Sequence, residues 1–208
     1  MNTEIFSTQD PLALPRALEI LQLGGLVAFP TDTVYGVGAL AFDGAAVEKI
    51  YVAKGRLVEK AIPVLIGDAV DLVKVSAEVP EIAQKLAARF WPGPLTLLVP
   101  KHPELPEAVS ATATVGVRIP DHPVARALLR QAGPMAVTSA NLSGQPSPSS
   151  VQEVLAQLGG RIALILDGGK TTGGVPSTVV DCNGLEPQVL RAGPISISEI
   201  LAVSGLRF

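Results

Sequence analysis

The spacing of strand-like and helix-like segments is the feature of this sequence that most constrains its fold. Apolar periodicity predicts helices over residues 11–23, 43–53, 80–90 and 150–158, a helix that contains Val124, Leu128 and Leu129, and a last helix after residue 196. Short apolar runs predict strands over residues 26–29, 62–66, 95–99, 115–119, 135–138, 161–166, 178–181 and 188–191. Strands and helices roughly alternate at first, but the last strands follow one another too closely for a helix between each pair. The sequence therefore predicts an α/β domain built around a mixed sheet.

Polar residues at helix starts support this assignment. Asp43 and Asp121 each precede an apolar helical pattern and are expected to act as N-caps. Ser196 and Glu199 have the spacing of a capping box at the start of the final helix.

Composition narrows the class of protein. The chain has 208 residues, 48% of them hydrophobic and 17% charged, which predicts one domain over residues 1–208 with a substantial aliphatic core. The net charge of -3 disfavours a protein that mainly coats nucleic acid or anionic membrane. Cys182 is the single cysteine, and we interpret it as a buried small hydrophobe in a reducing cytoplasm. No apolar run reaches the ~18 residues of a membrane helix, so a cytoplasmic protein with no membrane partner is expected.

The segment from Phe29 to Gly38 reads as a buried strand that breaks at Pro30 into a ligand-facing turn. Thr31, Thr33 and Tyr35 place hydroxyls at alternate positions, and the two glycines allow a close approach or a positive φ. In isolation, the segment is more typical of an ordinary polar strand end and turn than of a binding site.

Basic residues gather where the helix over residues 43–53 ends. Lys54, Arg56 and Lys60 suit a polyphosphate, because an arginine offers planar paired donors and a lysine a mobile charge. The same residues are also typical of a helix C-terminus, where cations are favourable.

Other strands also end in polar groups. Ser139 and Asn141 follow one strand, Arg118 lies within another, and Ser177 and Arg191 flank two more. Because ligands collect at strand ends in open α/β sheets, we expect several of these turns to converge on one pocket.

Several kinds of chemistry are disfavoured. The segment around Gly169 and Lys170 fails the phosphate-loop pattern, since Leu164 stands where a glycine is required. There is no G-x-S-x-G elbow, and His102 and His122 form no recognisable triad. With so few soft ligands we predict no protein-held metal, although Mg²⁺ can accompany a nucleotide.

Taken together, several motifs in the same order resemble the YrdC family over about residues 12–201. They are P-T-D-T-V-Y-G at 30–36, K-G-R at 54–56, W-P-G-P-L-T at 91–96, V-R-I-P at 117–120, T-S-A-N at 138–141, P-S-T-V-V-D at 176–181 and L-R-A-G at 190–193. The resemblance implies a twisted open sheet of parallel and antiparallel strands, flanked by helices around a concave cavity. It also implies a nucleotidyltransferase that condenses L-threonine, bicarbonate and ATP into threonylcarbamoyl-AMP and pyrophosphate. Partner proteins would then transfer the threonylcarbamoyl group to tRNA.

The resemblance also implies roles for individual residues. L-Threonine would contact Thr33, Arg118, Ser139 and Ser177. ATP, with Mg²⁺, would contact Lys54, Arg56, Lys60, Thr114, Asn141, Ser149 and Arg191. The catalytic residues would be Lys54 and Arg56, which stabilise phosphate charge, with Ser139 and Asn141, which orient the carbamate.

Two positions depart from the family pattern. Leu57 replaces a frequent proline after the K-G-R motif, and Leu65 stands where some members place a polar threonine contact, which is therefore not carried over. The chain is expected to be the short single-domain form, with residues 143–150 as a mobile lid. Two alternatives stay open: a carbamoyl-adenylate-forming enzyme that uses carbamoyl phosphate, and a module with weak RNA binding on a basic surface.

Overall fold

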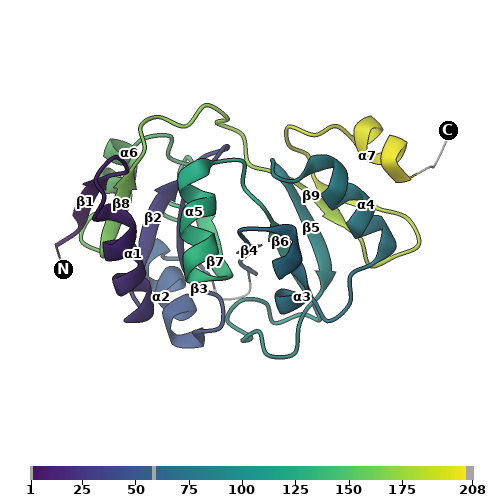
Figure 1. Ribbon diagram of the computed structural model, residues 1–208, viewed down its shortest axis with the longest axis horizontal. Helices are drawn as coiled ribbons and strands as arrows, with labels where there is room; N and C mark the ends of the chain where they lie inside the picture. The colour runs from purple at the N-terminus through teal and green to yellow at the C-terminus, as the bar shows by residue number, and fades with distance from the viewer. Residues whose placement is uncertain (1, 58–59, 205–208) are drawn as a thin grey trace.

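A single mixed sheet forms the centre of the molecule in the computed structural model, which describes residues 2–57 and 60–204 (Figure 1). Its strands follow the order β1-β8-β2-β3-β7-β4-β6-β5-β9-β10. Parallel and antiparallel pairs both occur, which confirms the predicted mixed sheet. The strands are β1 Glu4–Ser7, β2 Val27–Pro30, β3 Tyr35–Leu40, β4 Val64–Leu65, β5 Leu95–Pro100, β6 Thr114–Arg118, β7 Met135–Ser139, β8 Leu164–Asp167, β9 Thr178–Asp181 and β10 Gln188–Arg191.

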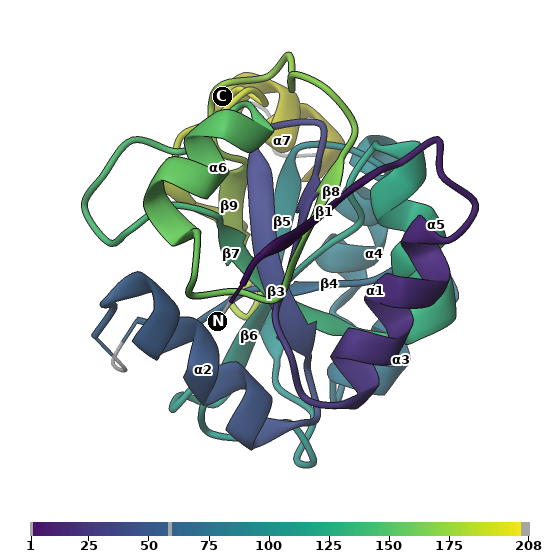
Figure 2. The ribbon, with the colours of Figure 1, turned by 90° about the vertical axis from the view of Figure 1, so that its left-hand side faces the viewer.

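Helices cover both faces of the sheet. They are α1 Ala13–Gln22, α2 Gly44–Lys54, the 3-10 turn η1 Ala69–Asp71, α3 Leu72–Val75, α4 Glu81–Phe90, α5 Pro123–Ala132, α6 Val151–Leu158 and α7 Ile197–Ser204. Figure 2 shows α1 and α5 on one side of the sheet and α2 and α6 on the other. No helix within the described residues is both long and apolar enough to cross a bilayer.

Two aliphatic cores result from this layering. One contains Phe29 and Leu128 and joins the sheet to α1 and α5. The other contains Tyr35, Ile50 and Leu86 and joins the sheet to α2, α4 and α6. Cys182 is 1% exposed, which confirms its interpretation as a buried apolar residue.

The predicted helix caps are mostly confirmed. The Asp43 carboxylate accepts from Ala46 N at 3.0 Å, and Ser196 and Glu199 exchange the hydrogen bonds of a capping box. The prediction for Asp121 was wrong: α5 begins at Pro123, and His122 occupies the N-cap without a side-chain bond. Proline suits this first helical position because it fixes φ there and lacks the N–H that would have no partner within the helix.

The segment over residues 29–38 is a hairpin and not one extended turn. Residues 31–34 connect β2 to β3, and β3 already begins at Tyr35. Gly36 and Gly38 lie inside β3 and do not adopt positive φ, so their function is close packing against β7. Strand β4 is shorter than predicted, and β1, η1 and α3 were not anticipated because their apolar patterns are short.

Candidate functional site

A polar cavity of about 80 Å³ lies where the β2–β3 turn meets the ends of several strands. Gly36 and Val137 form part of its wall, and Leu65 adds an apolar surface. The remaining lining residues are Thr31, Thr33, Val34, Pro63, Thr96, Arg118, Thr138, Pro176, Ser177 and Arg191. The site is thus made of strand ends that are far apart in the sequence, as the pattern of polar strand termini predicts.

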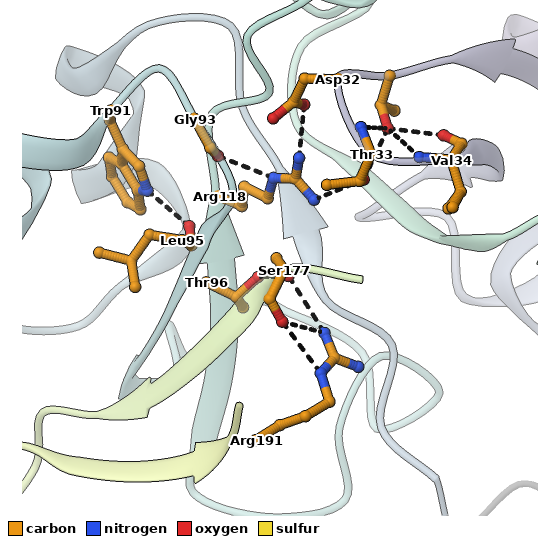
Figure 3. A network of polar contacts seen from close by, with 11 residues as sticks. Asp32, Thr33, Val34, Trp91, Gly93, Leu95, Thr96, Arg118, Ser177 and Arg191 are labelled. Carbon is orange, nitrogen blue, oxygen red and sulfur yellow. Dashed lines mark hydrogen bonds and ion pairs between the residues drawn. The ribbon is translucent and has the colours of Figure 1, made fainter. Parts of the chain in front are cut away.

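Arg118, at the end of β6, is the central charge of this cavity and is only 7% exposed (Figure 3). Its Nε donates to Gly93 O at 3.0 Å and its Nη1 donates to Thr33 Oγ1 at 3.2 Å. Its Nη2 pairs with the Asp32 carboxylate at 2.5 Å. Three hydrogen bonds from two segments, the β2–β3 turn and the loop after α4, therefore fix the guanidinium in one orientation.

Burial lowers the pKa of Arg118, and the Asp32 carboxylate opposes that shift. An arginine nevertheless remains charged in proteins, so the cavity presents a fixed cation. A guanidinium has five N–H donors, and the three hydrogen bonds leave two for a ligand. This arrangement suits an anion such as a carboxylate.

Hydroxyl groups surround this cation on two sides. Thr31 Oγ1 and Thr33 Oγ1 are 3.0 Å apart in the β2–β3 turn. Thr96 Oγ1 and Ser177 Oγ are 2.8 Å apart, and Arg191 donates to both the carbonyl and the hydroxyl of Ser177. Each hydroxyl can donate or accept, so the cavity can bind a small molecule that carries both kinds of group.

Lys54 lies at the end of α2 and is 2% exposed. Its Nζ lies 2.5 Å from both Ser139 O and Asn141 O, so it holds the turn after β7. Burial, aided by the charge of Arg56, lowers the pKa of Lys54 to about 8. The Asn141 amide donates to Leu142 O and Gln145 O, whereas its buried Oδ1 has no hydrogen-bond partner among the described residues.

The other predicted nucleotide residues lie outside the cavity lining. Arg56 donates to the carbonyls of Lys60 and Ala61 in the loop after α2. Thr114 lies at the start of β6 beside Thr112.

Ser149 is held by Glu153, which accepts from its N–H at 2.6 Å and from its hydroxyl at 3.2 Å. The segment over residues 143–150 is anchored at both ends, because Ser143 N donates to Lys54 O and Thr171 N donates to Ser149 O. Its closure over a ligand stays a prediction.

The structure thus sorts the predicted residues into two groups. The cavity brings together Thr33, Arg118, Ser177 and Arg191. The second group is assembled around Lys54, Ser139 and Asn141 through backbone contacts. Outside both groups, Arg56 and Lys60 share the loop after α2, Thr114 begins β6, and Ser149 precedes α6.

Sequence reasoning assigned no role to Asp32, Thr96 or Gly93, all of which contact this network. The available signal was that a buried arginine needs a carboxylate, and Asp32 follows the strand that ends at Pro30.

Comparison with known proteins assigns the chain to a family. The model of the Sua5/YciO/YrdC family, described as "Telomere recombination", matches residues 19–193. The chain belongs to this family.

Among its relatives is a Bacillus subtilis threonylcarbamoyl-AMP synthase, 47% identical over 98% of this chain and 59% of that protein. A Vibrio cholerae threonylcarbamoyl-AMP synthase is 38% identical over 86% of this chain and 97% of its own length. The crystal structure of Pyrococcus abyssi Sua5 complexed with L-threonine matches with a TM-score of 0.92 and 40% identity, over 98% of this chain and 61% of that one. The chain therefore spans about three fifths of the Bacillus and Pyrococcus proteins.

No group of three His, Cys, Asp or Glu side chains close enough to hold a metal ion occurs within residues 2–57 and 60–204. The hydrogen-bonding side chains that line the polar cavity are hydroxyls and guanidinium groups. These are groups that bind and orient organic anions.

Proposed function

We propose that this protein is an L-threonylcarbamoyladenylate synthase, which converts L-threonine, bicarbonate and ATP into threonylcarbamoyl-AMP and pyrophosphate. Its product would serve threonylcarbamoyl transfer to tRNA by partner proteins. The relatives named threonylcarbamoyl-AMP synthase support this assignment. Mg²⁺ would arrive with the phosphates of ATP, as part of the substrate.

The observation that carries the proposal is the fixed guanidinium of Arg118 inside a hydroxyl-lined cavity. Its two remaining N–H donors would bind the carboxylate of threonine. Ser177 and Thr33 lie on either side and would receive the amino and hydroxyl groups. A cavity of about 80 Å³ is small, which favours an amino-acid-sized ligand over a larger one.

The chemistry requires two bond-forming steps. The threonine amine attacks the bicarbonate carbon, water leaves, and an N-carboxylate forms. An oxygen of that carboxylate then attacks the α-phosphorus of ATP, and the bond to the β,γ-phosphates breaks to release pyrophosphate. Both steps need positioning and charge neutralisation more than a protein nucleophile.

The protein's own groups would supply these effects. Lys54 fixes the turn that carries Ser139 and Asn141, which would orient the carboxylate intermediate. Arg56 and Arg191 would be the cations that meet the phosphate charge. Loss of one such preorganised donor should reduce turnover ~10²-fold. Normal turnover and normal ATP affinity in the variant Arg56→Ala would therefore contradict a role of Arg56 in phosphate binding.

The decisive experiment measures pyrophosphate release from ATP with bicarbonate and L-threonine. Matched reactions contain L-serine, no amino acid, or carbamoyl phosphate. Release that needs both threonine and bicarbonate is expected. Release only with carbamoyl phosphate would reassign the protein to carbamoyl-adenylate formation, and no release with salt-dependent tRNA binding would favour an RNA-binding role.

A substitution links the assay to the site. Arg118→Lys keeps the charge but cannot make the same three hydrogen bonds, so the KM for threonine should rise about tenfold or more while the KM for ATP changes little. Equal increases in the KM values for threonine and ATP would contradict a specific role of Arg118 in threonine recognition.

A further inference from the structure

A second and larger cleft, of about 640 Å³, lies apart from the candidate site. It is bounded by η1, α3, α4, α5 and the segment after α4, and it shares no lining residue with the polar cavity. Figures 1 and 2 show α3, α4 and α5 on one side of the molecule, with α2 and α6 on the other. The cleft has the size of a typical small-molecule pocket.

The wall of this cleft is apolar, and one end of it is positively charged. Leu72, Val79 and Trp91 contribute apolar surface. At the rim, Arg126 and Arg130 both bind the single carboxylate of Asp68, at 3.0 Å and 2.7 Å.

One rim donor is not used by the protein. Arg126 donates through Nε to Gly67 O and through Nη2 to Asp68, whereas its Nη1 makes no hydrogen bond to any part of the chain that the structure describes. Two guanidinium groups on one carboxylate leave a surplus positive charge beside an apolar surface. A molecule that joins an aromatic or branched apolar body to an anionic group is complementary to both features.

The cleft is connected to Arg118 by a short segment of backbone (Figure 3). Trp91 and Pro92 line the cleft, and the next residue, Gly93, accepts from Arg118 Nε at 3.0 Å. Gly93 N donates to the carbonyl of Ile119, another lining residue, at 2.9 Å. Trp91 Nε1 also donates to Leu95 O at 2.7 Å, one residue before Thr96 of the polar cavity.

We propose that this cleft is a second binding site for an amphipathic organic anion, and that its occupancy changes the position of Arg118 through residues 91–93. The apolar body would lie against Trp91, and the anionic group would bind Arg126. A molecule in contact with Trp91 and Pro92 would displace the adjoining Gly93 carbonyl, which accepts a hydrogen bond from Arg118 Nε. The coupling to threonine rests on the proposed function, whereas the binding site itself does not.

Binding can be tested directly because Trp91 is the only tryptophan of the chain. Its fluorescence would be followed while anilinonaphthalene sulfonate is added to the full-length protein. Phenylnaphthylamine, which has the same aromatic body without the sulfonate, is the matched probe. We expect both probes to shift the Trp91 emission saturably, with the sulfonate binding more tightly; no saturable shift with either would overturn the proposal.

Three variants locate the binding. Arg126→Gln should weaken sulfonate binding about tenfold and leave phenylnaphthylamine binding unchanged. Ala88→Phe places a ring in the cleft and should abolish binding of both probes. Val52→Ser changes a separate cleft beside α2 and should alter neither. If Arg126→Gln weakened both probes equally, or Val52→Ser matched Ala88→Phe, the assignment of this cleft would be wrong.

Coupling is tested by measuring L-threonine affinity calorimetrically with and without saturating probe. Because coupling is reciprocal, threonine should change the probe affinity by the same factor, about fivefold or more. A change below about twofold in both directions would overturn the coupling. Absence of threonine binding without any probe would instead count against the proposed function, so the two failures are distinguishable.

Discussion

The carboxylate of Asp32 and the guanidinium of Arg118 form an ion pair in which Oδ1 lies 2.5 Å from Nη2. The side chains are 14% and 8% exposed, so water screens this pair poorly. Asp32 follows β2 and Arg118 ends β6, and the pair therefore ties together two strands that are not neighbours in the sheet. Its removal should affect stability as well as ligand binding.

Substitution Asp32→Asn should lower the free energy of unfolding by about 3 kcal/mol, because it leaves a buried guanidinium without its counter-charge. Urea denaturation measures this change. The matched control is Asp68→Asn, where the carboxylate is 41% exposed and paired with two arginines near the surface, and a much smaller loss is expected because water screens the pair. Equal losses in the two variants would contradict the buried-pair argument.

The hydrogen bond between Thr96 and Ser177 offers a second test of the site. Thr96→Val keeps the shape of a side chain that is 2% exposed and removes its 2.8 Å bond to Ser177 Oγ. The free energy of unfolding should fall by about 1 kcal/mol, because a buried hydrogen bond is lost. The affinity for L-threonine should fall about fivefold, because the Ser177 hydroxyl is no longer held by Thr96. Calorimetric titration with L-threonine measures the second effect.

Its control lies on the adjacent strand. Thr178 is 1% exposed and bonds Ile195 O at 2.9 Å, away from the polar cavity. Thr178→Val should cause a similar loss of stability with unchanged threonine affinity. If both variants weakened threonine binding equally, the effect of Thr96 would be a general loss of packing.

The fold was largely predictable because its signals are local. Apolar periodicity located α1, α2, α4 and α6 to within about two residues and indicated α5 through Val124, Leu128 and Leu129, and the ranges of β9 and β10 agree with the prediction. The strand order could not be predicted, since the pairing of β3 with β7 and of β5 with β9 depends on contacts between distant segments.

The site was predictable only in part, for a related physical reason. Polar residues at strand ends indicated Arg118 and Ser177, which the cavity brings together. Sequence could not show that Lys54 turns inward onto two carbonyls, because a lysine at a helix end is ordinarily solvated. It also could not show that Gly93 holds Arg118 through its backbone, since any residue type has that carbonyl.

The buried ammonium of Lys54 predicts a pH dependence of stability. Its pKa is about 8 in the folded protein against 10.5 for an ordinary lysine, mainly because of burial. Between pH 8 and 10.5 the unfolded chain binds more protons at this group, so its contribution to stability rises with pH. The unfolding free energy of the wild type relative to Lys54→Met should therefore increase across that window. A difference that stays flat or falls would show that the two carbonyl contacts outweigh burial.

Close packing between β3 and β7 explains the two glycines of the hairpin. A Cβ at Gly36 would lie 2.7 Å from Val137 Cγ1, and its next neighbour is at 3.6 Å. A Cβ at Gly38 would lie 2.7 Å from Val137 Cγ2 and also 2.8 Å from the backbone oxygen of Ala136. The first clash therefore involves one side chain, whereas the second also involves the sheet itself.

This difference predicts which glycine can be rescued. Gly36→Ala and Gly38→Ala should each lower the free energy of unfolding by about 2 kcal/mol, as overpacked core variants do. Adding Val137→Ala removes the only close contact of the first variant, so the pair should show a favourable coupling of about 1 kcal/mol or more in a double-mutant cycle. The Gly38→Ala pair should stay destabilised, because the clash with the Ala136 carbonyl remains. Equal rescue at both positions would mean that β7 moves as a unit and that the backbone contact at Gly38 is not limiting.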